Sequence, residues 1–137
     1  MQATQSTILL VHPLGYSAKR AGSDISRVAN IMPPLGLASI SAYLTAQGFC
    51  NDIIDCYAHP DSDELILAYL RRENPSFIGF SCTTSSFFDG ERLARLAKSV
   101  SPAIRVVFGG VHVSALREEV LAAYPLIDYV IVGEGEE

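Results

Sequence analysis

The chain has 137 residues, of which 49% are hydrophobic and 18% charged, and its formal net charge at pH 7 is −5. This length suits one domain with its own core, and the composition is typical of a folded globular protein rather than a disordered one. Because Lys and Arg form no cluster, DNA and RNA are excluded as expected partners. The start, MQATQST, lacks the pattern of a signal peptide, and no apolar run approaches the ~20 residues of a membrane span, so we expect a cytoplasmic protein.

The cysteines carry no recognisable metal pattern. Cys50, Cys56 and Cys82 are odd in number, and their spacing matches neither a zinc nor an iron–sulfur site. Cysteine without such a pattern behaves as a small hydrophobic residue. The sequence therefore predicts buried thiols and no metal site.

Short apolar runs predict five strands that are covered on both faces, as in a parallel sheet. The runs are residues 7–12 (TILLVH), 52–57 (DIIDCY), 77–82 (FIGFSC), 104–108 (IRVVF) and 129–133 (YVIVG). Between them, the spacing of apolar residues predicts helices over residues 33–48, 61–72, 87–100 and 113–124. Strands and helices therefore alternate.

Several residues mark the ends and the buried sides of these helices. Gly48 suits the position just after the first helix, and Asp61 with Glu64 forms a variant of the capping box at the start of the second. The last two helices each carry one apolar stripe, which we expect to face the core: Leu93, Leu96, Ala97 and Val100 in the third helix, and Val113, Leu116, Val120 and Tyr124 in the fourth.

Alternating strands and helices predict an α/β domain with helices on both faces of a five-stranded parallel sheet. This is a flavodoxin-like, Rossmann-like three-layer fold with strand order 2-1-3-4-5, in which ligands bind at the carboxyl edge of the sheet, at the switch point between strands 1 and 3. The segment from Pro13 to Met32 has no periodicity, and loops of that length are usually functional. We expect it to cover the ligand.

Small and hydroxyl-bearing residues follow the predicted strands. No pair of aspartates ends the first strand, as a phospho-accepting receiver domain would require, and neither a P-loop nor a GxGxxG motif is present. The turn CTTSSF could hold the phosphate of a flavin, but it follows the third strand rather than the first. Gly109 and Gly110 allow two interpretations: a strand end with positive φ, or bare backbone against a flat ligand.

Four stretches give the chain a specific resemblance. MPPLGLASISAYLTAQGF, IGFSCTTSSF, VVFGGVHVSALREEVL and DYVIVGEGEE follow one another in this order. Together they resemble the cobalamin (B12)-binding domain found at the amino terminus of many radical S-adenosylmethionine enzymes. The resemblance covers nearly all of residues 1–137, as a single cobalamin-binding domain, and GGVHVS with VGEGE is its most specific part.

The resemblance implies that the carboxyl edge binds the corrin ring, with the nucleotide tail between strands 1 and 3. Ser81, Thr83 and Thr84 would then hydrogen-bond the tail, and His112 would also belong to the cofactor-binding residues. The remaining implied contacts come from Gly109 and Gly110, against the tail or the corrin amides, and from Gly133, Glu134 and Gly135, around the ring. On this interpretation Gly110→Val should block the cofactor and leave the fold largely intact.

The chain departs from better-known cobalamin domains after the first strand. Their D-x-H-x-x-G motif supplies a histidine to cobalt, with its aspartate orienting the ring. Here His12 and Gly15 remain, but Leu10 stands where the aspartate would be. We therefore expect base-off cobalamin with no cobalt ligand from the protein, and His12 in a structural or hydrogen-bonding role.

The cysteines also depart from the family's catalytic pattern, because they cannot form the C-x-x-x-C-x-x-C motif that holds a [4Fe–4S] cluster. We therefore expect a fragment of a longer enzyme, not catalytic alone, with exposed apolar surface near the fifth strand. In the parent, a C-terminal radical S-adenosylmethionine domain would use cobalamin for methyl transfer or for rearrangement or oxidative-cyclase chemistry. The alternatives are the same fold without cofactor, as an interaction or substrate-recognition domain, and an FMN-binding module.

Overall fold

The structure is a computed structural model, and it describes residues 6–15, 33–59 and 61–135. These ranges contain one parallel sheet of five strands in the order β2-β1-β3-β4-β5, which confirms the predicted fold class. The strands are β1 (Thr7–His12), β2 (Cys50–Asp55), β3 (Phe77–Ser81), β4 (Arg105–Gly109) and β5 (Tyr129–Val130). The helices are α2 (Leu35–Ala46), α3 (Ser62–Glu73), α4 (Phe87–Val100), α5 (Val111–Leu116) and α6 (Glu118–Ala123).

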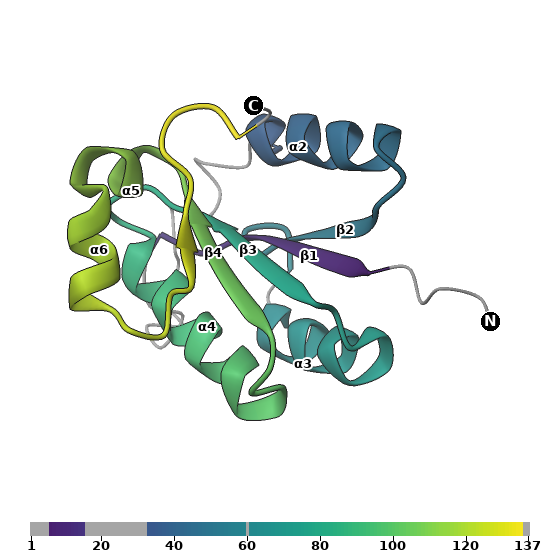
Figure 1. The fold of residues 1–137 in the computed structure, drawn as a ribbon. Helices are drawn as coiled ribbons and strands as arrows, with labels where there is room; N and C mark the ends of the chain where they lie inside the picture. Colours follow the sequence, from purple (N-terminus) through teal and green to yellow (C-terminus); the bar gives the residue numbers. More distant parts are fainter. Residues whose placement is uncertain (1–5, 16–32, 60, 136–137) are drawn as a thin grey trace.

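The helices cover the two faces of the sheet unequally (Figure 1). Helix α2 lies on one face, beside β1 and β2, whereas α3 and α4 lie on the other, and α5 and α6 pack beside β4 and β5. After β5 the chain runs across toward α2, as the yellow segment of Figure 1 shows. In the described ranges, no helix is long and apolar enough to cross a membrane.

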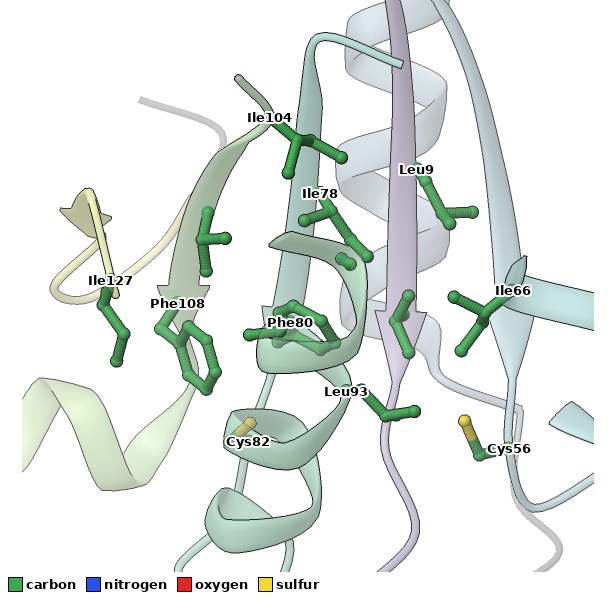
Figure 2. Packing of buried hydrophobic residues seen from close by; sticks show 14 of the residues in the cluster. Leu9, Cys56, Ile66, Ile78, Phe80, Cys82, Leu93, Ile104, Phe108 and Ile127 are labelled. Atoms are coloured by element: carbon green, nitrogen blue, oxygen red, sulfur yellow. The ribbon is translucent and has the colours of Figure 1, made fainter. Parts of the chain in front are cut away.

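The hydrophobic core lies between the sheet and the two helices α3 and α4, which cover one of its faces (Figure 2). Side chains alternate along each strand, so Ile78 and Phe80 of β3 and Phe108 of β4 point into this core. Each of them is at most 2% exposed. The Phe87 ring of α4 completes the packing, with its centroid 5.5 Å from that of Phe108. One face of the sheet is therefore closed by large side chains.

Most predicted ends of strands and helices agree with the structure, and the main differences lie in β2, β5 and the last predicted helix. Strand β2 begins at Cys50 rather than Asp52, and β5 pairs over two residues only. The predicted last helix is divided at Arg117, whose φ of 52° no α-helix allows, and Leu116 consequently leaves the apolar stripe with 39% exposure. The expected helix end at Gly48 is confirmed by its φ of 86°.

Two further predictions concern the start of α3 and the surface next to β5. Asp61 occupies the N-cap position of α3, but its side chain makes no capping hydrogen bond, so the predicted capping box is wrong. The expected apolar surface next to β5 is confirmed, since Tyr129 is 51% and Val132 45% exposed. The expectation that the loop after β1 covers the ligand concerns residues 16–32, which lie outside the described residues.

Asp128 ties the short strand β5 to the rest of the sheet. Its Oδ2 accepts hydrogen bonds from the Val106 backbone N–H and from Lys98 Nζ, both at 2.8 Å. Partial burial alone would raise the pKa of this carboxyl, but the hydrogen bonds from Lys98 and Val106 outweigh it and hold the pKa below its usual value. This contact positions the segment that follows β5.

Two of the three cysteines are buried. Burial raises the pKa of Cys56 to about 11, although a hydrogen bond with Ser62 opposes the shift, and it raises the pKa of Cys82 to about 12 against a hydrogen bond with Ser86. Cys50 is exposed, so the prediction of buried thiols is wrong for this residue. Because the thiolate is the reactive form of cysteine, the two buried thiols are protected both by access and by protonation.

We predict that a thiol reagent such as DTNB modifies Cys50 alone in the folded protein at pH 8. The Cys50→Ser variant should then show no rapidly reacting thiol. Unfolding this variant in guanidinium should make Cys56 and Cys82 reactive. Absorbance of the released thionitrobenzoate counts the thiols. Rapid modification of Cys56 or Cys82 in the folded protein would contradict the packing of this core.

The Asp128 contact predicts a pH-dependent part of the stability. Because the pKa of Asp128 is lowered on folding from its ordinary value of 3.8, its stabilisation is present above that value and is lost as the pH falls through the folded pKa. Asp128→Asn should lower the free energy of unfolding by about 1 kcal/mol at pH 7, with the difference vanishing in acid. Urea unfolding at several pH values measures this, and Asp61→Asn, which removes no capping bond, is the control.

Candidate functional site

A cavity of about 650 Å³ lies on the face of the sheet that α2 covers. Its volume is in the range of small-molecule sites, ~300–1,000 Å³. It reaches the carboxyl edge of the sheet between α2 and the segment after β5. Its lining is mostly apolar or glycine and consists of Ile8, Leu10, Gly36, Leu37, Ile40, Leu44, Phe49, Phe77, Gly79, Phe80, Ser81, Val107, Gly109, Gly110, Ile131, Gly133, Glu134 and Gly135. The ligand position expected for this fold is therefore hollow.

The floor of the cavity consists of strand residues that point away from the core. Strand pairing sets Leu10 beside Gly79 and Gly79 beside Val107, which forms one row across the sheet. The next row toward the carboxyl edge pairs Ser81 with Gly109. The floor thus loses side-chain volume toward the edge. Leu10 leans over Gly79, where a Cβ would lie 3.2 Å from Leu10 Cδ2, whereas the space over Gly109 is open to 3.8 Å.

The walls of the cavity come from two segments far apart in the sequence. Gly36, Ile40 and Leu44 recur every four residues on one side of α2, so they share the face that looks onto the cavity. The opposite wall is the segment after β5, and it closes onto α2 near Gly135. A Cβ built on Gly135 would lie 3.0 Å from Ile40 Cδ1.

Polar side chains are scarce in this cavity: of its described lining residues, Ser81 and Glu134 alone contribute them. Glu134 is exposed and belongs to the mouth. Ser81 lies at the end of β3, and no group among the described residues forms a hydrogen bond with its hydroxyl. The interior therefore offers apolar surface and one hydroxyl group.

The structure brings together six of the nine residues that the sequence predicts for the cofactor: Ser81, Gly109, Gly110, Gly133, Glu134 and Gly135 line the cavity. Thr83, Thr84 and His112 lie outside its lining. The Thr83 hydroxyl lies 3.0 Å from that of Ser85, and Thr84 Oγ1 lies 3.2 Å from His112 Nδ1. Their hydroxyl groups thus hold the turn after β3 rather than pointing into the hollow.

The floor and the α2 wall of the cavity were not predicted from the sequence. One signal was present, since a glycine inside a predicted strand often marks the close approach of a ligand, and Gly79 is such a residue. Gly36 gave a similar signal at the start of a predicted helix. The apolar floor residues Leu10 and Val107 carried no signal of their own, because buried aliphatic residues are expected in any strand of such a sheet.

The two adjacent glycines are bare for different reasons. Gly110 has a φ of 98°, and a Cβ there would lie 2.4 Å from the backbone oxygen of Cys82, so the protein's own chain excludes a side chain. A Cβ on Gly109 would meet its nearest neighbour, Ile131, at an ordinary 3.8 Å. The expectation that Gly110→Val leaves the fold intact is therefore wrong, and Gly109 is the one whose smallness leaves room.

His12 is held by the neighbouring strand. Its Nδ1 lies 3.0 Å from Oδ1 of Asp55, its partner residue in β2, and its ring lies 5.1 Å from that of Tyr57. The carboxylate that Leu10 does not provide thus comes from β2. The Tyr57 hydroxyl also accepts a hydrogen bond from the Gly15 N–H, at 2.8 Å. His12 lies outside the lining of the cavity, and its role toward cobalt stays a prediction.

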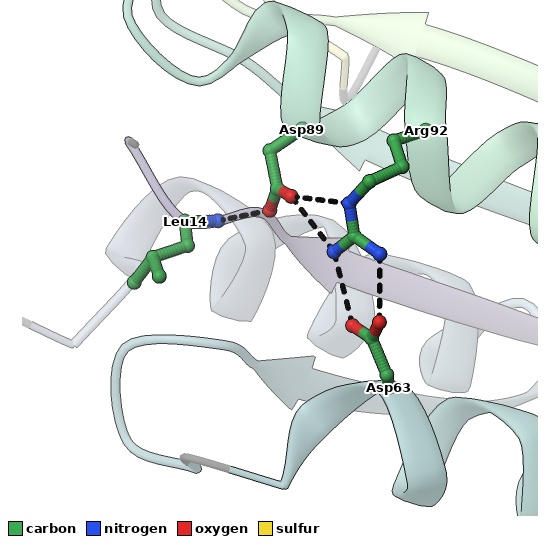
Figure 3. Close-up of polar contacts among 4 residues, drawn as sticks. All are labelled: Leu14, Asp63, Asp89 and Arg92. Atoms are coloured by element: carbon green, nitrogen blue, oxygen red, sulfur yellow. Dashed lines mark hydrogen bonds and ion pairs between the residues drawn. The ribbon is translucent and has the colours of Figure 1, made fainter. Parts of the chain in front are cut away.

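An ion-pair network fixes the chain where it leaves β1 (Figure 3). The Leu14 N–H donates to Asp89 Oδ2 at 2.9 Å, while Arg92 pairs with the other oxygen of Asp89. The same guanidinium donates two hydrogen bonds to Asp63, at 2.6 and 3.0 Å. Because the Leu14 side chain is buried as well, the first residues after β1 are held against α3 and α4.

Comparison with known proteins agrees with this geometry. The family model described as the B12 binding domain matches residues 24–137. The chain is 30% identical over 131 residues to an anaerobic magnesium-protoporphyrin IX monomethyl ester cyclase of Rubrivivax gelatinosus, an alignment that covers 95% of this chain and 22% of the relative. It is 35% identical over 130 residues to an uncharacterized methyltransferase of Pyrococcus horikoshii, covering 94% of this chain and 27% of the relative. The chain thus spans about a quarter of the length of these relatives.

The glycine pair gives a prediction that needs no ligand. Gly110→Ala should lower the free energy of unfolding by about 2 kcal/mol or more, because it forces a Cβ against backbone at positive φ. Gly109→Ala should stay within about 1 kcal/mol of the original protein. Urea unfolding followed by circular dichroism measures both. Equal stability of the two variants would contradict the different roles assigned to these glycines.

Proposed function

Because the chain belongs to the B12-binding domain family, we propose that it holds cobalamin at the carboxyl edge of its sheet and presents it to a catalytic domain elsewhere in the whole protein. The observation that carries this proposal is the apolar cavity whose floor is bare at Gly79 and Gly109. The periphery of a corrin ring bears polar amides, whereas the nucleotide base of cobalamin is flat and apolar. The cavity interior suits the base, and its mouth suits the ring.

Each part of the chain has a distinct task in this proposal. The Ser81 hydroxyl donates a hydrogen bond to the base, and Gly109 lets the base approach the backbone of β4. Gly133, Glu134 and Gly135 border the ring at the mouth, while Gly110 keeps β4 close to β3. Thr83, Thr84 and His112 lie just beyond the cavity, where the corrin amides are the candidates for contact.

Bound cobalamin supplies a cobalt centre that carries a methyl group or takes part in radical chemistry, and the protein supplies orientation and access. The names of the relatives fit either use, since one group is cyclases and another a methyltransferase. We propose that the whole protein adds a radical S-adenosylmethionine domain with a [4Fe–4S] cluster, and that it acts in the cytoplasm. This chain then serves as the cofactor-binding part.

Two other functions are compatible with the fold. An FMN-binding module would need donors for the terminal phosphate. The lining residues within the described ranges offer the single hydroxyl of Ser81 in the interior and no basic side chain. A domain that has lost its cofactor, and that recognises a partner or substrate instead, has no need of a hollow carboxyl edge. The cavity therefore favours cobalamin over both.

A binding experiment separates the three functions. The protein is mixed with hydroxocobalamin and, separately, with FMN, then desalted, and its absorption spectrum is recorded. We expect corrin bands at a stoichiometry of about one per chain and no flavin bands. Flavin bands would support the FMN module, and the absence of both chromophores would support the domain without cofactor.

A variant on α2 tests the place of binding. Gly36 lines the cavity, and a Cβ there meets nothing within 4 Å, so Gly36→Leu should fill the hollow without straining the helix. We expect it to unfold at a midpoint no lower than that of the original protein but to retain at least about tenfold less cobalamin. Ala38→Leu places the same side chain on an exposed position of α2 outside the cavity lining and should retain cobalamin fully. Full retention by Gly36→Leu would place the cofactor elsewhere.

A further inference from the structure

Among the residues that the structure describes, the interior of the cavity carries one polar side chain. The floor residues lie on β1, β3 and β4, which are flanked by strands on both sides, so their backbone N–H and C=O groups are used in the sheet. The α2 wall adds Gly36, Leu37, Ile40 and Leu44, which have no polar side-chain atoms. Apart from the exposed Glu134 at the mouth, the Ser81 hydroxyl is the one polar side-chain group in the described part of the lining.

Cobamides carry different nucleotide bases, and these bases differ in how many polar atoms they present. A benzimidazole that is released from cobalt presents one ring nitrogen, which accepts a single hydrogen bond. An adenine presents that acceptor and, in addition, two further ring nitrogens and an amino group. A polar atom that leaves water for an apolar site without a partner weakens binding, so the number of unmatched atoms decides between the bases.

We propose that the cavity selects a benzimidazole over a purine as the base of the cobamide it binds, an inference that rests on the proposed function. The Ser81 hydroxyl satisfies the one free nitrogen of a benzimidazole, and the described lining residues leave the extra polar atoms of a purine without side-chain partners. Leu10 and Val107 lie on either side of the bare Gly79 in the floor. They offer apolar contact to the ring carbons and methyl groups of 5,6-dimethylbenzimidazole.

The test measures dissociation constants by equilibrium dialysis for three corrinoids in the hydroxo or aquo form: cobalamin, the corresponding adenine cobamide, and cobinamide, which lacks the nucleotide. We expect cobalamin to bind at least about tenfold more tightly than the adenine cobamide, which corresponds to about 1.4 kcal/mol. Cobinamide should bind more weakly than cobalamin, because it leaves the cavity without a base.

A variant separates the selectivity of the cavity from the intrinsic difference between the two cobamides. Val107→Thr keeps the shape of the side chain and adds a hydroxyl inside the cavity, which can pair with a purine. The two cobamides release their own base from cobalt with different ease, but this property cancels when the affinity ratio of the variant is divided by that of the original protein. We expect the preference for cobalamin to fall about threefold or more in Val107→Thr. Val132→Thr makes the same change outside the cavity lining and should leave the preference unchanged.

The outcomes separate this inference from the proposed function. If cobalamin and the adenine cobamide bind equally well, the selection is overturned while cobalamin binding stands. If cobinamide binds as tightly as cobalamin, the base does not occupy the cavity, and the selection is again overturned. If none of the corrinoids binds, the proposed function itself fails. Even if Val107→Thr does not fold, the affinity ratio of the original protein tests the selection once it is corrected for the base-release equilibria of the two free cobamides, which their absorption spectra measure.

Discussion

The distribution of side-chain volume between the two faces of β3 and β4 is the constraint on which the rest of the structure depends. On one face, Ile78, Phe80 and Phe108 fill the core beneath α3 and α4. On the other, Gly79 and Gly109 leave the backbone bare. A strand alternates its side chains between faces, so one stretch of sequence both closes the core and opens a cavity. The asymmetry of the helices follows from this, since α2 covers β1 and β2 and leaves the bare part of the sheet open at the carboxyl edge.

Much of this architecture could be predicted from the sequence because its signals are local. Apolar runs and helical spacing gave the strands, the order of the sheet and α4 with its correct bounds. Signals that depend on tertiary packing were missed. Arg117 breaks the last helix at a point where the residue types look helical, and Asp61 stands at a helix start without bonding to it. The number of strands predicted the topology. The pairing of β5 over only two residues and its tie to β4 through Asp128 were missed, because no run of residues reveals them.

The cavity lies at the edge where the sequence predicts a ligand, and six of the nine predicted site residues line it. The polar and glycine residues that follow the strands were predicted as site residues, and Ser81 and Gly109 do line the cavity. The same reasoning gave Gly110 a ligand-facing role, whereas the Cβ position of this residue falls on the Cys82 carbonyl of its own chain. A pair of glycines in sequence cannot distinguish bare backbone kept for a ligand from bare backbone needed for packing. The pairing of His12 with Asp55 has the same character, since two residues 43 apart meet only through strand register.

The two borders of the sheet bear on how copies of this protein meet one another. Strand β5 pairs with β4 over two residues, which leaves a very short row of free backbone groups at that border. At the opposite border, β2 carries Asn51, Asp52 and Asp55, whose polarity and charge oppose growth of the sheet by another molecule. Both borders, as far as the described residues form them, thus carry features that disfavour self-association through strand addition. The exposed apolar residues next to β5 are left to be covered by side-chain packing, so the contacts they make are selected by shape rather than by backbone pairing.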